Sequence, residues 1–172
     1  MGTTAERDRD DAGRPRSTRP RDALGRPLPY GSAGVARIPD DLELAPADTL
    51  AYAQRLLDRG QAFSAHEVLE AAWKNGPEHE RSLWQGLAQL AVGITHVQRG
   101  NRVGAAALLR RASTRLSAVG SPAPYDVDVA GLVAYADDLA AHLDNNLDDD
   151  LDRTADVPEQ RLRPRLVGNP AG

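Results

Sequence analysis

Apolar residues recur every three or four positions through the middle of the chain, as they do on one face of an amphipathic helix. Between the apolar runs stand prolines and glycines, which end helices. The pattern predicts five helices, over residues 47–59, 64–76, 78–99, 102–118 and 128–142. Leu50, Ala53, Leu56 and Leu57 carry the stripe of the first helix, and Leu132, Ala136 and Leu139 carry that of the last.

An internal repeat at a spacing of 40 residues organises these helices. Arg59, Gly60, Ala65, Leu69 and Ala72 return as Arg99, Gly100, Ala105, Leu109 and Ala112. We therefore expect an all-α fold, a compact bundle of about five helices built from two stacked helix-turn-helix hairpins with disordered tails. The first copy departs from the second where His66, Glu67, Glu70 and Trp73 correspond to Ala106, Ala107, Arg110 and Ser113. We therefore expect functional side chains at these four positions of the first copy.

Proline, glycine and charge divide the remainder of the chain. We expect a disordered N-terminal tail over 1–24, an extended Pro/Gly-rich strap over 25–46, a helical domain over 47–144 and an acidic, proline-containing C-terminal tail over 145–172. The strap contains Leu28 and Tyr30. Its expected role is to bury these two side chains on the helices, with a ligand-gating flap as the alternative.

Composition narrows the classes of partner. The 172 residues carry a net charge of −4, so we expect no nucleic-acid partner. We expect no membrane partner and a cytoplasmic location, since the sequence has no run of about 18 apolar residues and no signal-peptide pattern. The absence of cysteine excludes disulfides and thiolate metal sites.

The third predicted helix combines an apolar stripe with polar residues. Gln85, Gln89 and His96 lie on one side of a helix that is otherwise nearly apolar, and buried polar groups need partners. The nearest available partners are His66 and Glu70 on the preceding helix, whereas Glu67 is expected to point elsewhere. On another flank, Gly86 and Gly93 would let a helix or ligand approach closely.

Three interpretations of this polar cluster remain open. The cluster could be an internal hydrogen-bond network that fixes helix register. It could be a pocket for a small ligand or peptide, with walls from Trp73, Trp84 and Tyr30. It could be a metal or catalytic site in which His66, Glu70 and His96 bind an ion, and Glu67 or Gln89 orients water.

Two details limit the catalytic interpretation. Ser64 and Glu67 have the spacing of a capping box, which would make Glu67 purely structural. The pattern His66-Glu-x-x-Glu70 lacks the second histidine of the zinc peptidase motif, so peptidase chemistry is not supported.

Long motifs carry a family resemblance over residues 47 to 118. They are Ala65-His-Glu-Val-Leu-Glu-Ala-Ala-Trp73, Trp84-Gln-Gly-Leu-Ala-Gln-Leu-Ala-Val-Gly-Ile-Thr-His96 and Arg99-Gly-Asn101. These stretches resemble the domain of unknown function 309 family, and the segment 25–31 resembles that of its actinobacterial members. The resemblance implies a compact all-α fold and no established activity. The family motif positions on this chain are His66, Glu67, Glu70, Trp73, Gln85, Gln89, His96, Gly100 and Asn101.

The expected function is a non-enzymatic module that binds a small ligand or a protein. The pocket candidates are His66, Glu67, Glu70, Trp73, Gln85, Gln89, His96 and Asn101. The alternative is a metal-dependent enzyme with His66, Glu70 and His96 as ligands. The sequence identifies no cofactor beyond a conceivable divalent metal, and it is compatible with a homo-oligomer.

Overall fold

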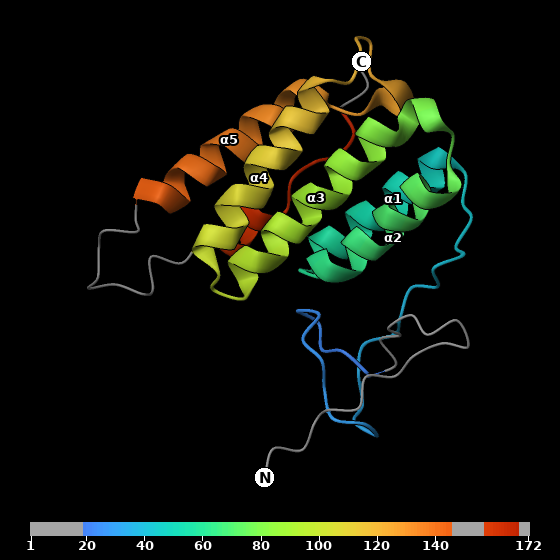
Figure 1. Cartoon of the computed structure of the whole chain (residues 1–172), viewed down its shortest axis with the longest axis vertical. Coiled ribbons are helices and arrows are strands. Elements are labelled where there is room, and N and C mark those ends of the chain that lie inside the picture. Colours follow the sequence, from blue (N-terminus) through green and yellow to red (C-terminus); the bar gives the residue numbers. More distant parts are fainter. Residues whose placement is uncertain (1–18, 146–156, 169–172) are drawn as a thin grey trace.

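The computed structural model describes residues 19–145 and 157–168, which form five α-helices. The helices are α1 (Pro46–Asp58), α2 (Ala62–Asn75), α3 (Arg81–Gln98), α4 (Arg102–Ser117) and α5 (Val129–Asn145). They lie side by side in chain order, each packing on the next (Figure 1). Short 3₁₀ turns η1 (Glu78–Glu80), η2 (Pro124–Asp126) and η3 (Glu159–Leu162) lie between or beyond them. The predicted all-α bundle of two stacked hairpins is confirmed.

The two hairpins turn in the same way. Gly60 and Gly100 have φ angles of +74° and +78°, a left-handed conformation that glycine adopts without a steric penalty. Each is preceded by the arginine of the repeat. The 40-residue echo is therefore the signature of two equivalent interhelical turns.

Helix α3 lies at the centre of the fold, with α2 on one side and α4 on the other. Leu87 and Ile94 are fully buried. A Cβ at Gly86 would lie 2.8 Å from the side chain of Leu116, and one at Gly93 would lie 3.0 Å from that of Leu109. The two glycines therefore let α4 approach α3 closely, as predicted.

The helix starts differ between the copies. Asn101 caps α4, where its side-chain oxygen accepts from the backbone N–H of Gly104 at 3.0 Å. The cap residue of α2 is Gln61, which makes no such side-chain bond, and the helix begins at Ala62. The predicted capping box of Ser64 and Glu67 is therefore wrong, because Ser64 already lies buried within the first turn.

The N-terminal segment, residues 19–45, runs beside the ends of α2 and α3 (Figure 1). Its anchors differ from those expected. Tyr30 is 56% exposed and Leu28 only half-buried, while Ile38 enters the core. Gly25 rests against the ring of Phe63, where its φ of +74° and lack of a side chain are both required. Residues 1–18 of the expected tail lie outside the described residues.

The expected C-terminal tail is wrong for residues 157–168, the C-terminal segment, which packs on the helices. Leu166 is 1% exposed, its backbone N–H donates to the Gln54 side chain on α1 at 2.9 Å, and its carbonyl accepts from Asp128 at 3.0 Å. Tyr135 of α5 donates to the backbone oxygen of Arg161 at 2.6 Å. The segment passes behind α3 and α4 and thereby links the first and last helices (Figure 1). The intervening residues 146–156 are not described.

Within the described ranges, none of the helices combines the length and the apolar character that crossing a bilayer requires.

Candidate functional site

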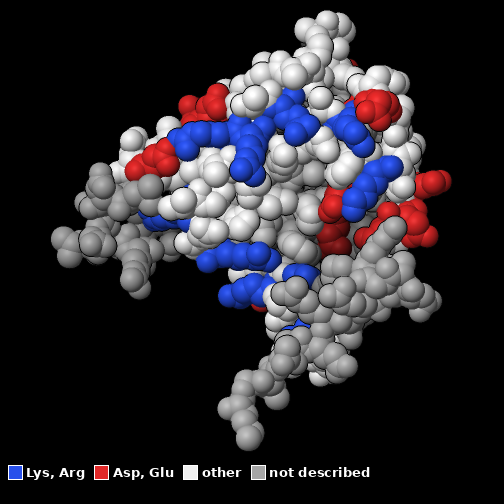
Figure 2. Space-filling view, in the orientation of Figure 1, with Lys and Arg blue, Asp and Glu red and all other residues white. Residues whose placement is uncertain are grey.

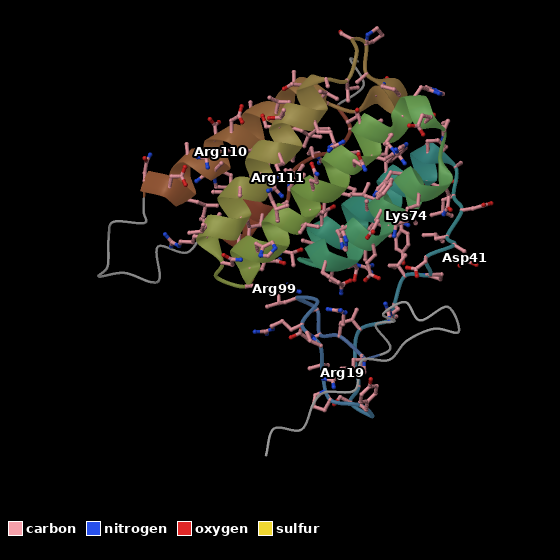
Figure 3. All side chains as sticks on the ribbon, in the orientation of Figure 1. Arg19, Asp41, Lys74, Arg99, Arg110 and Arg111 are labelled. Atoms are coloured by element: carbon pink, nitrogen blue, oxygen red, sulfur yellow. The ribbon has the colours of Figure 1, made fainter. Side chains whose placement is uncertain are left out.

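A cavity of about 180 Å³ lies between α2 and the N-terminal segment. It collects three of the predicted site residues, His66, Glu67 and Glu70. The described residues that line it are Arg21, Arg37, Asp40, Phe63, His66, Glu67, Glu70, Ala71 and Lys74. Acidic and basic side chains alternate on the surface near Lys74, whose position Figure 3 labels (Figures 2 and 3). We call this hollow the Glu67 cavity.

One wall of the Glu67 cavity is a chain of ionic contacts along α2. His66 Nε2 lies 3.0 Å from one Glu70 oxygen, and Lys74 Nζ lies 2.8 Å from the other. His66 Nδ1 lies 3.0 Å from the backbone oxygen of Phe63. The bond from His66, reinforced by Lys74, lowers the pKa of Glu70 from 4.5 to about 2. Glu70 is therefore a fixed carboxylate, held by two successive turns of the helix.

Glu67 is the exception in this wall. Burial raises the pKa of its carboxyl above the ordinary value, although His66, Arg37 and Arg21 act in the opposite direction. Within the described part of the chain its carboxylate has no hydrogen bond and no ion pair. The expectation that Glu67 points away from His66 and Glu70 is wrong, because all three line one hollow.

The opposite wall comes from the N-terminal segment, which supplies Arg21, Arg37 and Asp40. Sequence reasoning missed these residues because 19–45 has no helical periodicity that could place them. Phe63 contacts one of them, Arg21. The guanidinium carbons of Arg21 and Arg99 lie 5.5 Å and 5.7 Å from the centre of its ring. Phe63 is the single phenylalanine of the chain, which was the available signal for this anchor.

The other candidate residues are dispersed, so the predicted single network does not form. Gln85 accepts from Arg115 of α4 at 2.5 Å and makes no bond to α2. His96 pairs through Nδ1 with the side-chain nitrogen of Asn101 at 3.0 Å, and burial lowers its pKa. The buried Oε1 of Gln89 has no partner among the described residues.

Asn101 and Trp73 also lie outside the Glu67 cavity. Asn101 has two structural contacts, the cap of α4 and the bond to His96. Trp73 is half-buried, and Lys74 and Arg81 approach its ring at 6.0 Å and 5.4 Å. The expected aromatic walls are not those of this cavity, since Trp84 lies elsewhere and Tyr30 is exposed.

The predicted metal set is not assembled. Across residues 19–145 and 157–168, no three His, Cys, Asp or Glu side chains are grouped so that they could hold one ion. His96 is engaged with Asn101 at the end of α3, whereas His66 and Glu70 pair with each other on α2. The three-ligand set of His66, Glu70 and His96 is therefore incorrect.

Comparisons with known proteins agree with the motif. Residues 50–108 match the family model described as a domain of unknown function (DUF309). A stretch of 48 residues is 44% identical to the "Uncharacterized protein YpuF" of Bacillus subtilis (strain 168). That stretch covers 27% of this chain and 28% of the relative, so the similarity spans less than a third of either protein. No solved structure matches the chain.

Proposed function

We propose that this chain, which matches the DUF309 family model over residues 50–108, is a non-enzymatic binding module that holds a small ligand in the Glu67 cavity. The proposal rests on the environment of the Glu67 carboxyl. This carboxyl is half-buried and makes no hydrogen bond or ion pair in the described residues, and burial raises its pKa, so that its ionised form is disfavoured in the folded state. A ligand group that donates to it would stabilise the ionised form.

The charges around Glu67 favour a zwitterion. Glu67 faces Arg21 and Arg37 across the hollow, so one small molecule can present an ammonium group to the carboxylate and a carboxylate to the guanidinium groups. A volume of about 180 Å³ suits a molecule with few heavy atoms. Free amino acids are the simplest molecules with this pair of groups.

The same residues favour binding over covalent catalysis. Among the described residues of the lining, no hydroxyl or thiol side chain could act as a nucleophile. The amine of Lys74 is paired with Glu70, and both ring nitrogens of His66 lie beside oxygen atoms. Side chains that are paired in this way can orient a ligand and set the electrostatic potential of the site.

Saturation-transfer NMR with pools of the twenty free amino acids tests the proposal. We expect the signals of at least one amino acid to respond to the wild-type protein and to Glu78→Gln. Glu78 is an exposed glutamate outside the Glu67 cavity, so its substitution controls for general charge. The same signals should disappear with Glu67→Gln, which removes the charge and keeps the shape.

Two outcomes would overturn the proposal. One is the absence of any response in every pool, and the other is a response that survives Glu67→Gln. Urea unfolding of each variant accompanies the NMR, so that a loss of binding is not confused with a loss of structure.

A further inference from the structure

A second cavity, of about 310 Å³, lies on another side of α2, where residues 42–46 pass over its C-terminal half. Its walls combine apolar and polar groups. Leu42, Leu44, Val68 and Trp84 contribute apolar surface, and Thr49 and Asn75 contribute neutral polar groups. We call it the Glu80 cavity, after the carboxylate that lines it. Its volume falls within the range of about 300–1,000 Å³ that is usual for small-molecule sites.

Glu80 is a buried acid with neutral hydrogen-bond donors. Its residue is only 6% exposed. One carboxyl oxygen accepts from the indole N–H of Trp84 at 3.2 Å, and the other accepts from the Tyr125 hydroxyl at 2.5 Å. His79 Nε2 lies 3.8 Å away on a side chain that is 81% exposed. The two close partners orient the carboxylate but do not neutralise its charge.

The lining of the Glu80 cavity has one sign of charge. Its ionisable members are Glu43 and Glu80, and among the described residues no Lys, Arg or His contributes to the walls. A buried carboxylate attracts a cation more strongly than an exposed one does, because burial reduces the screening by water. The cavity therefore complements a positively charged ligand that has an apolar body.

Two aromatic rings hold the carboxylate in place. Trp84 is 2% exposed, and its ring stacks on that of Tyr125 with centres 6.1 Å apart. Because both rings also donate to Glu80, neither carboxyl oxygen can rotate without breaking a bond. The site is thus organised before any ligand arrives, which lowers the entropic cost of binding.

We propose that the Glu80 cavity binds a small apolar amine, with the ammonium group at the Glu80 carboxylate and the apolar body against Leu42, Leu44 and Val68. This cavity is distinct from the Glu67 cavity, although Ala71 contributes to the walls of both, and the proposal does not depend on the one made for the Glu67 cavity.

The test is an NMR titration that observes the two tryptophan indole N–H signals. The probe is 2-phenylethylamine, and 2-phenylethanol serves as a neutral probe of similar size. The amine should shift the Trp84 signal saturably, because that N–H donates to Glu80. The Trp73 signal is an internal control, since Trp73 does not line this cavity. We expect the alcohol to bind at least tenfold more weakly.

Two variants complete the design. Glu80→Gln keeps an oxygen acceptor for Trp84 and should weaken amine binding at least tenfold, whereas Glu78→Gln should match the wild type. If Glu80→Gln fails to fold, Ala72→Leu supplies an independent test, because it fills the cavity and leaves the carboxylate in place. It should also abolish the saturable shift.

Three results would overturn the proposal: no saturable shift of the Trp84 signal, equal binding of amine and alcohol, or amine binding that survives Glu80→Gln or Ala72→Leu. The amino-acid response of the Glu67 cavity is read separately, so the two sites can fail independently.

Discussion

The two hairpins use the same scaffold, but different elements cover their second helices. Ala65 and Leu69 of α2 are fully buried, as are their counterparts Ala105 and Leu109 of α4. Regular helix α5 packs on α4, whereas α2 is flanked on its open side by the irregular N-terminal segment. A helix seals the face it covers, but an irregular segment leaves hollows.

This difference explains where the repeat departs from itself. Ala106 stands in place of His66 and is 2% exposed, since a small apolar residue suits a sealed helix interface. Arg110 stands in place of Glu70 and forms a surface ion pair with Asp144 of α5. On α2 the same positions are polar and line a cavity. Three of the four departures in the repeat, His66, Glu67 and Glu70, thus lie where the irregular segment leaves a hollow on α2.

The largest expected effect on stability comes from substitutions in the buried core that the two hairpins share. Leu69→Ala and Leu109→Ala should each lower the free energy of unfolding by about 2–5 kcal/mol, because each leaves a cavity in a fully buried position. Urea denaturation provides the measurement. Val103→Ala, at a position that is 67% exposed, is the control and should have little effect. A cost below about 1 kcal/mol in only one hairpin would show that the copies are not equivalent.

Substitution of the N-cap residues of α4 and α2 should have smaller and unequal effects on stability. Asn101→Ala should cost about 1 kcal/mol, since it removes the side-chain cap of α4. Gln61→Ala should stay within about 0.5 kcal/mol of the wild type, because Gln61 makes no capping bond to α2. Thermal unfolding of the pair measures the contrast, and equal costs would contradict it.

Lowering the pH should reduce the contribution that ionised Glu70 makes to the stability of the fold. Its pKa is lowered to about 2, so the ionised group stabilises the folded state above its ordinary pKa of 4.5, and this contribution is lost as the pH falls toward 2. Glu70→Gln has no such contribution to lose. The stability gap between wild type and variant should narrow by about 1 kcal/mol between pH 6 and pH 3, after allowing for solvent screening. Urea unfolding at both pH values checks this, and a constant gap would refute it.

The fold was largely predictable because its signals are local. Apolar periodicity, prolines and the turn glycines Gly60 and Gly100 located all five helices to within a few residues. The close approach at Gly86 and Gly93 was also visible, since the two glycines share a helix flank. The C-terminal segment was not predictable in this way. Leu162 and Leu166 pack through isolated contacts across more than 100 residues, such as that between Gln54 and Leu166.

The site was predicted only in part, for the same reason. His66 and Glu70 lie one helical turn apart, so their pairing follows from sequence spacing. The partners of Gln85 and His96 do not follow from sequence spacing, because a polar stripe on a central helix can face either neighbouring helix. Gln85 bonds to Arg115 of α4, and His96 bonds to Asn101 in the turn that follows α3. Arg21 and Arg37 come from a segment without periodicity.

The free energy of unfolding of Glu67→Gln, compared with that of the wild type near neutral pH, tests most directly whether α2 carries a binding surface rather than a structural network. Burial raises the pKa of Glu67, so its ionised form opposes folding above the ordinary pKa, and removing the charge relieves that cost. We predict that the variant is as stable as the wild type or more stable by up to about 1 kcal/mol. A loss of about 1 kcal/mol or more would show that Glu67 supports the fold and would contradict the account.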